Sequence, residues 1–116
     1  MKYMLRKINR VSKRKAVEEL RKARIVFQSP IFGMLFVDKK DEEKRFLMVI
    51  SKRISKKAVI RNKLKRQMTE VVRLNLDKIR PGVRVGFLVR GKILEWEWKE
   101  IKTEMERALS EMGIMK

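Results

Sequence analysis

Positive charge is concentrated on residues 56–73, which read KKAVIRNKLKRQMTEVVR and include a single acidic residue, Glu70. Arg offers phosphate oxygens a planar pair of N–H donors, and Lys offers them a compact point charge. Neutralising phosphates releases the counterions of a nucleic acid, and this release supplies binding free energy. The chemistry that this stretch predicts is therefore the binding of a polyanion through its phosphates.

The stretch belongs to a longer run, residues 44–69, that contains no Asp or Glu. Its basic residues are Lys44, Arg45, Lys52, Arg53, Lys56, Lys57, Arg61, Lys63, Lys65 and Arg66. Solubility requires net charge, but it does not require charge of one sign along one segment. A membrane surface is a weaker alternative, because the apolar side of this segment has no bulky aromatic residue and is needed for the core. We interpret the run as a surface that binds RNA or DNA.

The composition agrees with this interpretation. The chain has 116 residues, enough for one compact domain, and its 32 Lys and Arg against 14 Asp and Glu give a net charge of +18. Self-repulsion of this size favours an anionic partner. The charge is distributed unevenly along the chain, because residues 1–94 carry a net charge of +20 and residues 95–116 a net charge of −2.

Several classes of chemistry are disfavoured by what the chain lacks. It has no Cys and no His, which removes disulfides, zinc–thiolate sites, Cys nucleophiles and His-based catalysis. The acidic cluster at residues 41–43 falls in a predicted turn, whereas metal nucleases need converging carboxylates on rigid elements. We predict no catalytic and no metal-binding residues. No apolar run reaches the ~20 residues that span a bilayer, and the N-terminus has no apolar signal core, so we expect a cytoplasmic protein.

The remaining pattern predicts one domain of alternating helices and strands. Helices are expected at residues 12–24, 56–73 and 94–112, and strands at residues 31–37, 45–51 and 83–90. On the basic helix, steps of ~100° per residue place Ile60, Leu64, Met68 and Val71 on a buried stripe. They place Asn62, Arg66, Thr69 and Arg73 on the opposite, exposed face. The loop at residues 51–57 leads into this helix, whose N-terminal N–H groups and dipole would also attract phosphate.

Aromatic residues leave two readings open. Phe32 and Phe36 share the parity of one strand, so both belong either to the core or to a platform on which single-stranded bases stack. Trp98 falls on the apolar stripe of the last helix and is expected in the core. Trp96 lies off that stripe.

Residues 50–72, ISKRISKKAVIRNKLKRQMTEVV, closely resemble the signature of the bacterial ribonuclease P protein component. The family's R-N-R core corresponds to Arg61-Asn62-Lys63. Around it, Asn9-Arg10 with Lys13 resembles the N-terminal N-R-L-x-K motif, Ser29-Pro30-x-Phe32 resembles the S-P-x-F entry to the first strand, and Arg90 resembles the Arg that closes the last strand.

This resemblance implies an α+β fold in one RNA-binding domain, residues 1–116. The order is α-β-β-β-α-β-α, with three helices, a small mixed four-stranded sheet and a left-handed crossover into the last strand. It implies an accessory subunit of ribonuclease P, the endonuclease that removes 5′ leaders from precursor tRNA. Its partners would be the catalytic RNA and precursor tRNA. That RNA would hold Mg²⁺ and carry the catalysis, and the protein, expected to be a monomer, would not cleave alone.

The resemblance also implies two sets of site residues. The residues expected to bind the catalytic RNA are Arg10, Lys13, Lys56, Lys57, Arg61, Asn62, Lys63, Lys65, Arg66 and Arg73. The residues expected to bind the leader, in a cleft between the first helix and the sheet, are Val17, Phe32, Leu35, Ser51, Lys52, Arg53 and Arg90. Val17 and Leu35 stand where the family usually has aromatic residues, so leader binding is expected to depend more on charge here.

Two other functions fit the composition without the motif. A structural RNA-binding protein, such as a ribosomal protein, would co-purify with ribosomal RNA rather than with one catalytic RNA. A protein-only nuclease would cleave precursor tRNA without added RNA.

Overall fold

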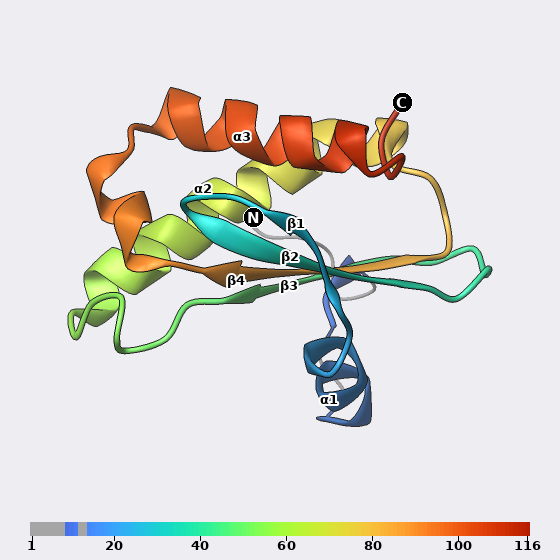
Figure 1. The fold of residues 1–116 in the computed structure, drawn as a ribbon, viewed down its shortest axis with the longest axis horizontal. Helices are drawn as coiled ribbons and strands as arrows, with labels where there is room; N and C mark the ends of the chain where they lie inside the picture. The colour runs from blue at the N-terminus through green and yellow to red at the C-terminus, as the bar shows by residue number, and fades with distance from the viewer. Residues whose placement is uncertain (1–8, 12–13) are drawn as a thin grey trace.

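The computed structural model describes residues 9–11 and 14–116 (Figure 1). Its elements are α1 (Arg14–Arg21), β1 (Ile25–Gln28), β2 (Phe32–Asp38), β3 (Lys44–Val49), α2 (Ala58–Asn75), β4 (Val83–Val89) and α3 (Trp98–Glu111), with 3₁₀ turns at Leu76–Lys78 and Gly91–Glu95. The expected order, α-β-β-β-α-β-α, is confirmed.

The four strands form one mixed sheet in the order β1-β2-β4-β3. β2 runs antiparallel to both β1 and β4, whereas β3 runs parallel to β4 with Met48 opposite Phe87. Parallel neighbours need a crossover connection, and α2 supplies it between β3 and β4. The left-handed course of this crossover stays a prediction of the resemblance.

The helices cover both faces of the sheet, with α2 and α3 on one side and α1 on the other (Figure 1). Alternate strand residues point to opposite faces. Phe46, Val85 and Phe87 face α2 and α3 in the main core, whereas Leu35 joins Leu20 of α1 in a smaller cluster. Gly86 permits this second contact, because a Cβ there would lie 3.3 Å from Leu20 Cδ2.

The structure corrects several expected boundaries. The helix predicted at residues 12–24 is α1, Arg14–Arg21, and its first two predicted residues lie outside the described part of the chain. Strand β1, Ile25–Gln28, was not predicted from the residues. The helix predicted at residues 94–112 begins only at Trp98, where Glu97 and Glu100 form a reciprocal capping box. Gly113, with φ of +71°, follows its last turn as expected of a C-terminal cap.

The stripe of α2 is largely confirmed, with one error. Leu64, Met68 and Val71 are buried and Ile60 packs against the same core. Thr69, predicted to be exposed, is only 7% exposed. Val72 is buried as well, so the second half of α2 is enclosed over a wider arc than one stripe. The first half of the helix keeps its broad exposed face.

The Ser29-Pro30-x-Phe32 motif connects the sheet to the last helix. Ser29 Oγ donates a hydrogen bond to Glu104 Oε2 at 2.6 Å and accepts one from the Ile31 N–H at 3.2 Å. Arg107 Nε donates to Glu104 Oε1 at 2.9 Å. These contacts hold the turn between β1 and β2 against α3, so the motif has a structural role here.

Glu104 should make stability depend on acidity. The Arg107 guanidinium, and after it the Ser29 hydroxyl, hold the pKa of this carboxyl below its ordinary value of 4.5 although burial opposes the shift. Its contribution to the free energy of unfolding is therefore present above the unfolded pKa and is lost as the pH falls through the folded pKa. In urea unfolding, the stability difference between the wild type and Glu104→Gln should shrink on acidification. A difference that is constant from neutral to acidic pH would contradict this assignment.

Candidate nucleic-acid interface

The first half of α2 and the loop before it present an exposed cationic surface. We define the α2 cationic surface as Lys56, Lys57, Lys63, Lys65 and Arg66, all of which are exposed. Asn62 is also exposed among them. The inward stripe of α2 fixes this orientation, since burying Leu64 and Met68 turns these residues to the outside. The predicted exposed face is thus confirmed for Asn62, Arg66 and Arg73.

The loop before α2 is held by its own hydrogen bonds. The Ile54 N–H donates to the Ser51 carbonyl at 3.1 Å, and the Lys57 N–H donates to Ser55 Oγ at 3.2 Å. Lys57 is the N-cap of α2, no side chain caps the helix, and no acidic residue occupies its first turn. The partial positive charge of the helix N-terminus is therefore not offset locally and adds to the field of the Lys side chains.

The charge of this surface is not neutralised by the protein itself. Over residues 9–11 and 14–116, no ion pair involves a member of the α2 cationic surface. Elsewhere several arginines have carboxylate partners, as Arg84 has in Asp41 at 2.6 Å and Arg107 has in Glu104 at 2.9 Å. An unpaired cationic surface of this kind is suited to the phosphates of a nucleic acid.

Two predicted RNA-binding arginines are engaged within the protein. Arg61 is half-buried, and its Nη1 donates a hydrogen bond to the Ser55 carbonyl at 2.8 Å. Arg73 donates from Nε and Nη2 to the two carboxylate oxygens of Glu70. This hydrogen bonding to the Glu70 carboxylate raises the pKa of Arg73. Arg61 therefore positions the loop, and the charge of Arg73 is largely compensated.

Arg61 and Arg66 should consequently respond differently to truncation. Arg61→Ala removes the bond to Ser55 and should lower the free energy of unfolding by about 0.5–1.5 kcal/mol. Arg66→Ala removes an exposed side chain and should change it by less than about 0.5 kcal/mol. Urea unfolding of both variants checks this difference. Equal stability of the two variants would show that the loop does not depend on Arg61.

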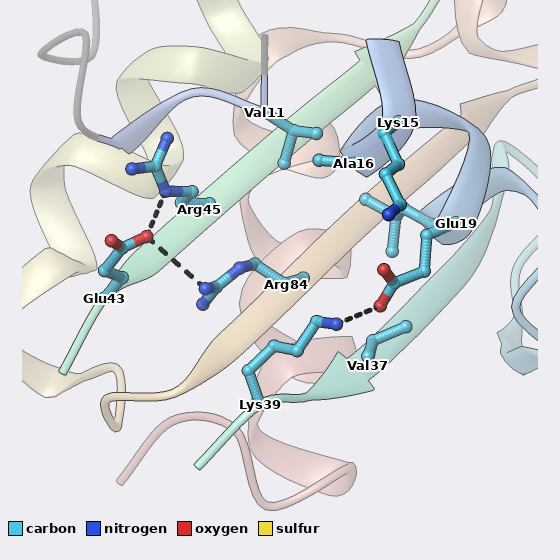
Figure 2. Close-up of a pocket in the computed structure, with 10 residues that line it drawn as sticks. Val11, Lys15, Ala16, Glu19, Val37, Lys39, Glu43, Arg45 and Arg84 are labelled. Carbon is cyan, nitrogen blue, oxygen red and sulfur yellow. Dashed lines mark hydrogen bonds and ion pairs between the residues drawn. The ribbon is translucent and has the colours of Figure 1, made fainter. Parts of the chain in front are cut away.

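A second candidate surface lies between α1 and the sheet (Figure 2). The groove there has a volume of about 310 Å³ and is lined by residues of α1, β2, β3 and β4, together with Lys39 after β2 and Glu43 before β3. Lys39 pairs with Glu19 across its mouth, and Glu43 pairs with both Arg45 and Arg84 along one side (Figure 2). Arg84 and Lys39 were not among the predicted site residues, because their distance in sequence from the basic run hides their place in this groove.

The residues predicted to bind the leader divide into two groups. Ser51, Lys52 and Arg53 are exposed in the loop before α2. Arg90 is also exposed, and its guanidinium donates to Gln28 Oε1 and, at 3.4 Å, to the Ser29 carbonyl. Parallel β3 and β4 end at the same edge of the sheet, so this loop and Arg90 leave the sheet on one side.

The other three predicted leader residues have little or no free surface. Phe32 is fully buried on the α2/α3 side, where its ring meets the Phe87 ring edge-on at 5.1 Å between centroids. Phe32 therefore cannot act as a stacking platform for bases. Of the two alternatives that the sequence left for this residue, a place in the core is the correct one. Leu35 is 1% exposed beneath α1, and Val17 is half-buried in the same cluster.

The N-terminal motif residues anchor the chain to β3. Asn9 is buried and its Nδ2 donates to the Lys44 carbonyl at 2.9 Å. The Arg10 carbonyl accepts a hydrogen bond from Arg45 Nη1 at 3.2 Å, and Arg10 forms a bridge with Phe46. Arg10 is half-buried, which leaves it less available to RNA than the α2 cationic surface. Lys13 lies outside the described residues.

No helix within residues 9–11 and 14–116 has the length and apolar character needed to cross a bilayer. Within the same residues, no group of three acidic side chains is placed to hold a metal ion.

Comparison with known proteins identifies similar chains. The sequence profile of the family described as Ribonuclease P matches residues 5–113. The chain is 34% identical over 68 residues to the ribonuclease P protein component of a Synechococcus strain, covering 59% of this chain and 51% of that protein. It is 37% identical over 71 residues to that of Rippkaea orientalis, covering 61% and 56%. The match thus spans about half the length of these two relatives.

The fold also has solved counterparts. The RNase P protein of Staphylococcus aureus superposes with a TM-score of 0.83 at 20% identity, covering 95% of this chain and all of that one. At this identity the likeness concerns the arrangement of helices and strands.

Proposed function

The chain belongs to the Ribonuclease P family, and we propose that it is the protein subunit of ribonuclease P. In this role it binds the catalytic RNA and the 5′ leader of precursor tRNA and supports endonucleolytic removal of the leader. The RNA carries the catalysis, and the protein supplies binding surface and charge.

The observation that supports this proposal best is the α2 cationic surface. Its five side chains are exposed and have no ion-pair partner among the described residues. Phosphate contacts from such a surface give affinity through counterion release. The basic segment of residues 50–72 that resembles the family signature contains the whole surface, so the motif and the charge point to the same partner.

The roles of the individual residues follow from their placement. We assign binding of the catalytic RNA to the α2 cationic surface and to Asn62, whose amide both donates and accepts hydrogen bonds. The leader is assigned to the 51–53 loop and Arg90, at the edge where β3 and β4 end. The groove of Figure 2 lies under α1 near the other end of these strands, where β3 and β4 begin. Phe32 has no part in the proposal because it is buried.

The setting of the protein is part of the proposal. The Mg²⁺ of the reaction would be held by the catalytic RNA and not by the protein. The protein acts as a monomer in the cytoplasm, and its absence of Cys is compatible with a reducing compartment.

Reconstituted cleavage tests the proposal. Precursor tRNA is incubated at low Mg²⁺ with the protein alone, with the cognate catalytic RNA alone, and with both. Only the pair should remove the leader efficiently. Cleavage by the protein alone would indicate a protein nuclease instead. A pair no more active than the RNA alone would exclude a subunit role and leave a structural RNA-binding protein, which sequencing of the co-purified RNA would then identify.

A further inference from the structure

A hollow lies in the seam between α2 and α3, beside the α2 cationic surface. It is lined by Lys63, Arg66, Gln67, Glu70 and Trp98, and its volume is about 490 Å³. This volume falls within the ~300–1,000 Å³ of sites that hold small organic molecules. None of the chemistry assigned so far uses Trp98.

The seam is closed at one end and open at the other. Towards the end of α2, Asn75 Nδ2 donates a hydrogen bond to Glu106 Oε2 at 2.8 Å, and Lys102 pairs with the same carboxylate at 3.0 Å. At the open end Trp98, the first residue of α3, is half-buried. Its ring packs against the main core, and it also forms a wall of the hollow. The indole is therefore held firmly while part of it remains accessible.

The charges around this indole favour an anion that carries an aromatic group. Lys63 and Arg66 border the hollow, and neither has an ion-pair partner within the described part of the chain. The carboxylate of Glu70 is compensated by Arg73. Glu100 lines a separate hollow with Trp96, so the acidic first turn of α3 does not face Trp98.

We propose that the hollow holds one unpaired nucleotide of an RNA, with its base stacked on Trp98 and its phosphate on Lys63 and Arg66. Stacking on an aromatic side chain accepts any base, and the adjacent cations hold the backbone. The Gln67 amide lines the same hollow and offers both a donor and an acceptor to the edge of the base. This inference rests on the proposed function in that an RNA lies along α2.

Trp98 can be isolated as a spectroscopic reporter. The chain has two Trp residues, so Trp96→Phe leaves Trp98 as the only one. The Trp96→Phe variant is titrated with a single-stranded oligoadenylate and with an abasic oligonucleotide of equal length and charge. Binding of each strand is followed in parallel by the fluorescence anisotropy of a label at its end. The oligoadenylate should quench Trp98 fluorescence and the abasic strand should bind without doing so. Equal responses to the two strands, or no response to either, would overturn the proposal.

Paired substitutions separate stacking from packing. Trp98→Phe keeps an aromatic ring, and Trp98→Leu keeps apolar volume without one, with urea unfolding used to confirm that both fold. Trp98→Leu should weaken oligoadenylate binding by at least ~5-fold, Trp98→Phe should weaken it less, and neither should alter binding of the abasic strand. Equal losses for Leu and Phe, or wild-type binding by both, would contradict a stacked base.

Failure of this inference can be told from failure of the proposed function. Lys65 belongs to the α2 cationic surface but does not line the hollow. If Lys65→Ala weakens binding of the cognate catalytic RNA and Trp98→Leu does not, the nucleotide site is wrong and the RNA-binding role of α2 stands. If neither substitution weakens it, both are wrong.

Discussion

Replacing Lys63, Lys65 and Arg66 together by Ala should reduce the dependence of RNA affinity on salt by roughly two to three units of log–log slope. Each phosphate that loses its cation retains its counterion, which lowers the slope by ~0.7 for single strands and ~0.9 for duplexes. If affinity at 1 M salt is unchanged, the affinity at 0.1 M should fall by roughly 10²- to 10³-fold. Filter binding or anisotropy with the cognate catalytic RNA, over a salt series, measures both quantities.

A matched variant controls for net charge. Lys40, Lys78 and Lys116 are exposed, and contacts of their backbones with Gly82 and with each other place them at the opposite end of the sheet from the start of α2. Replacing these three by Ala removes the same charge and should change the slope by less than one unit. Folding of both variants should match the wild type, since all the side chains removed are exposed. Similar slopes for the two triple variants would mean that RNA responds to overall charge and not to α2.

Phe87→Ala should destabilise the fold by about 3–5 kcal/mol. Phe87 is fully buried on β4, between β2 and β3, and its ring packs edge-on against Phe32. Removing the ring loses its transfer free energy and leaves a cavity that the sheet cannot close. For a domain whose total stability lies in the range of about 5–15 kcal/mol, the Tm should fall by roughly 10–20 °C.

Val59→Ala is the control for this change. Val59 is 77% exposed on α2, so its truncation should alter stability by less than about 0.5 kcal/mol. Thermal and urea unfolding of both variants give the comparison. A Phe87→Ala variant that unfolds with the wild-type midpoint would mean that β4 is not the centre of the core.

The elements that determine the interface were readable from the sequence because they depend on local periodicity. The stripe of Leu64, Met68 and Val71 at helical spacing identified both the inward and the cationic side of α2. The strands at 31–37, 45–51 and 83–90 were found within one or two residues of β2, β3 and β4. In each of these elements the spacing of apolar residues repeats over several positions, so that one atypical residue does not hide it.

The features of the fold and of the candidate site that the sequence did not predict depend on contacts between segments distant in the chain. β1 has four residues next to a helix, and only its pairing with β2 makes it a strand. The order of the strands in the sheet was not predicted from the residues, and β4 lies between β2 and β3 although it follows both in the chain. Parity grouped Phe32 with Phe36 but did not say which face of the sheet α2 and α3 cover. Thr69 was misplaced for the same reason, because a helical wheel assumes one buried side.

Cleavage of RNA from a probe tethered on α2 is the most direct measurement of where the RNA lies. The chain has no Cys, so Asn62→Cys introduces a single thiol on the exposed face of α2, to which an iron chelate that generates hydroxyl radicals is attached. A matched protein carries the chelate at Ser110→Cys, an exposed position near the end of α3. In the complex with the cognate catalytic RNA, the probe at residue 62 should cut a few defined sites and the probe at residue 110 should not cut them. Absence of cutting from residue 62, or the same cuts from both positions, would contradict the binding of this RNA by α2.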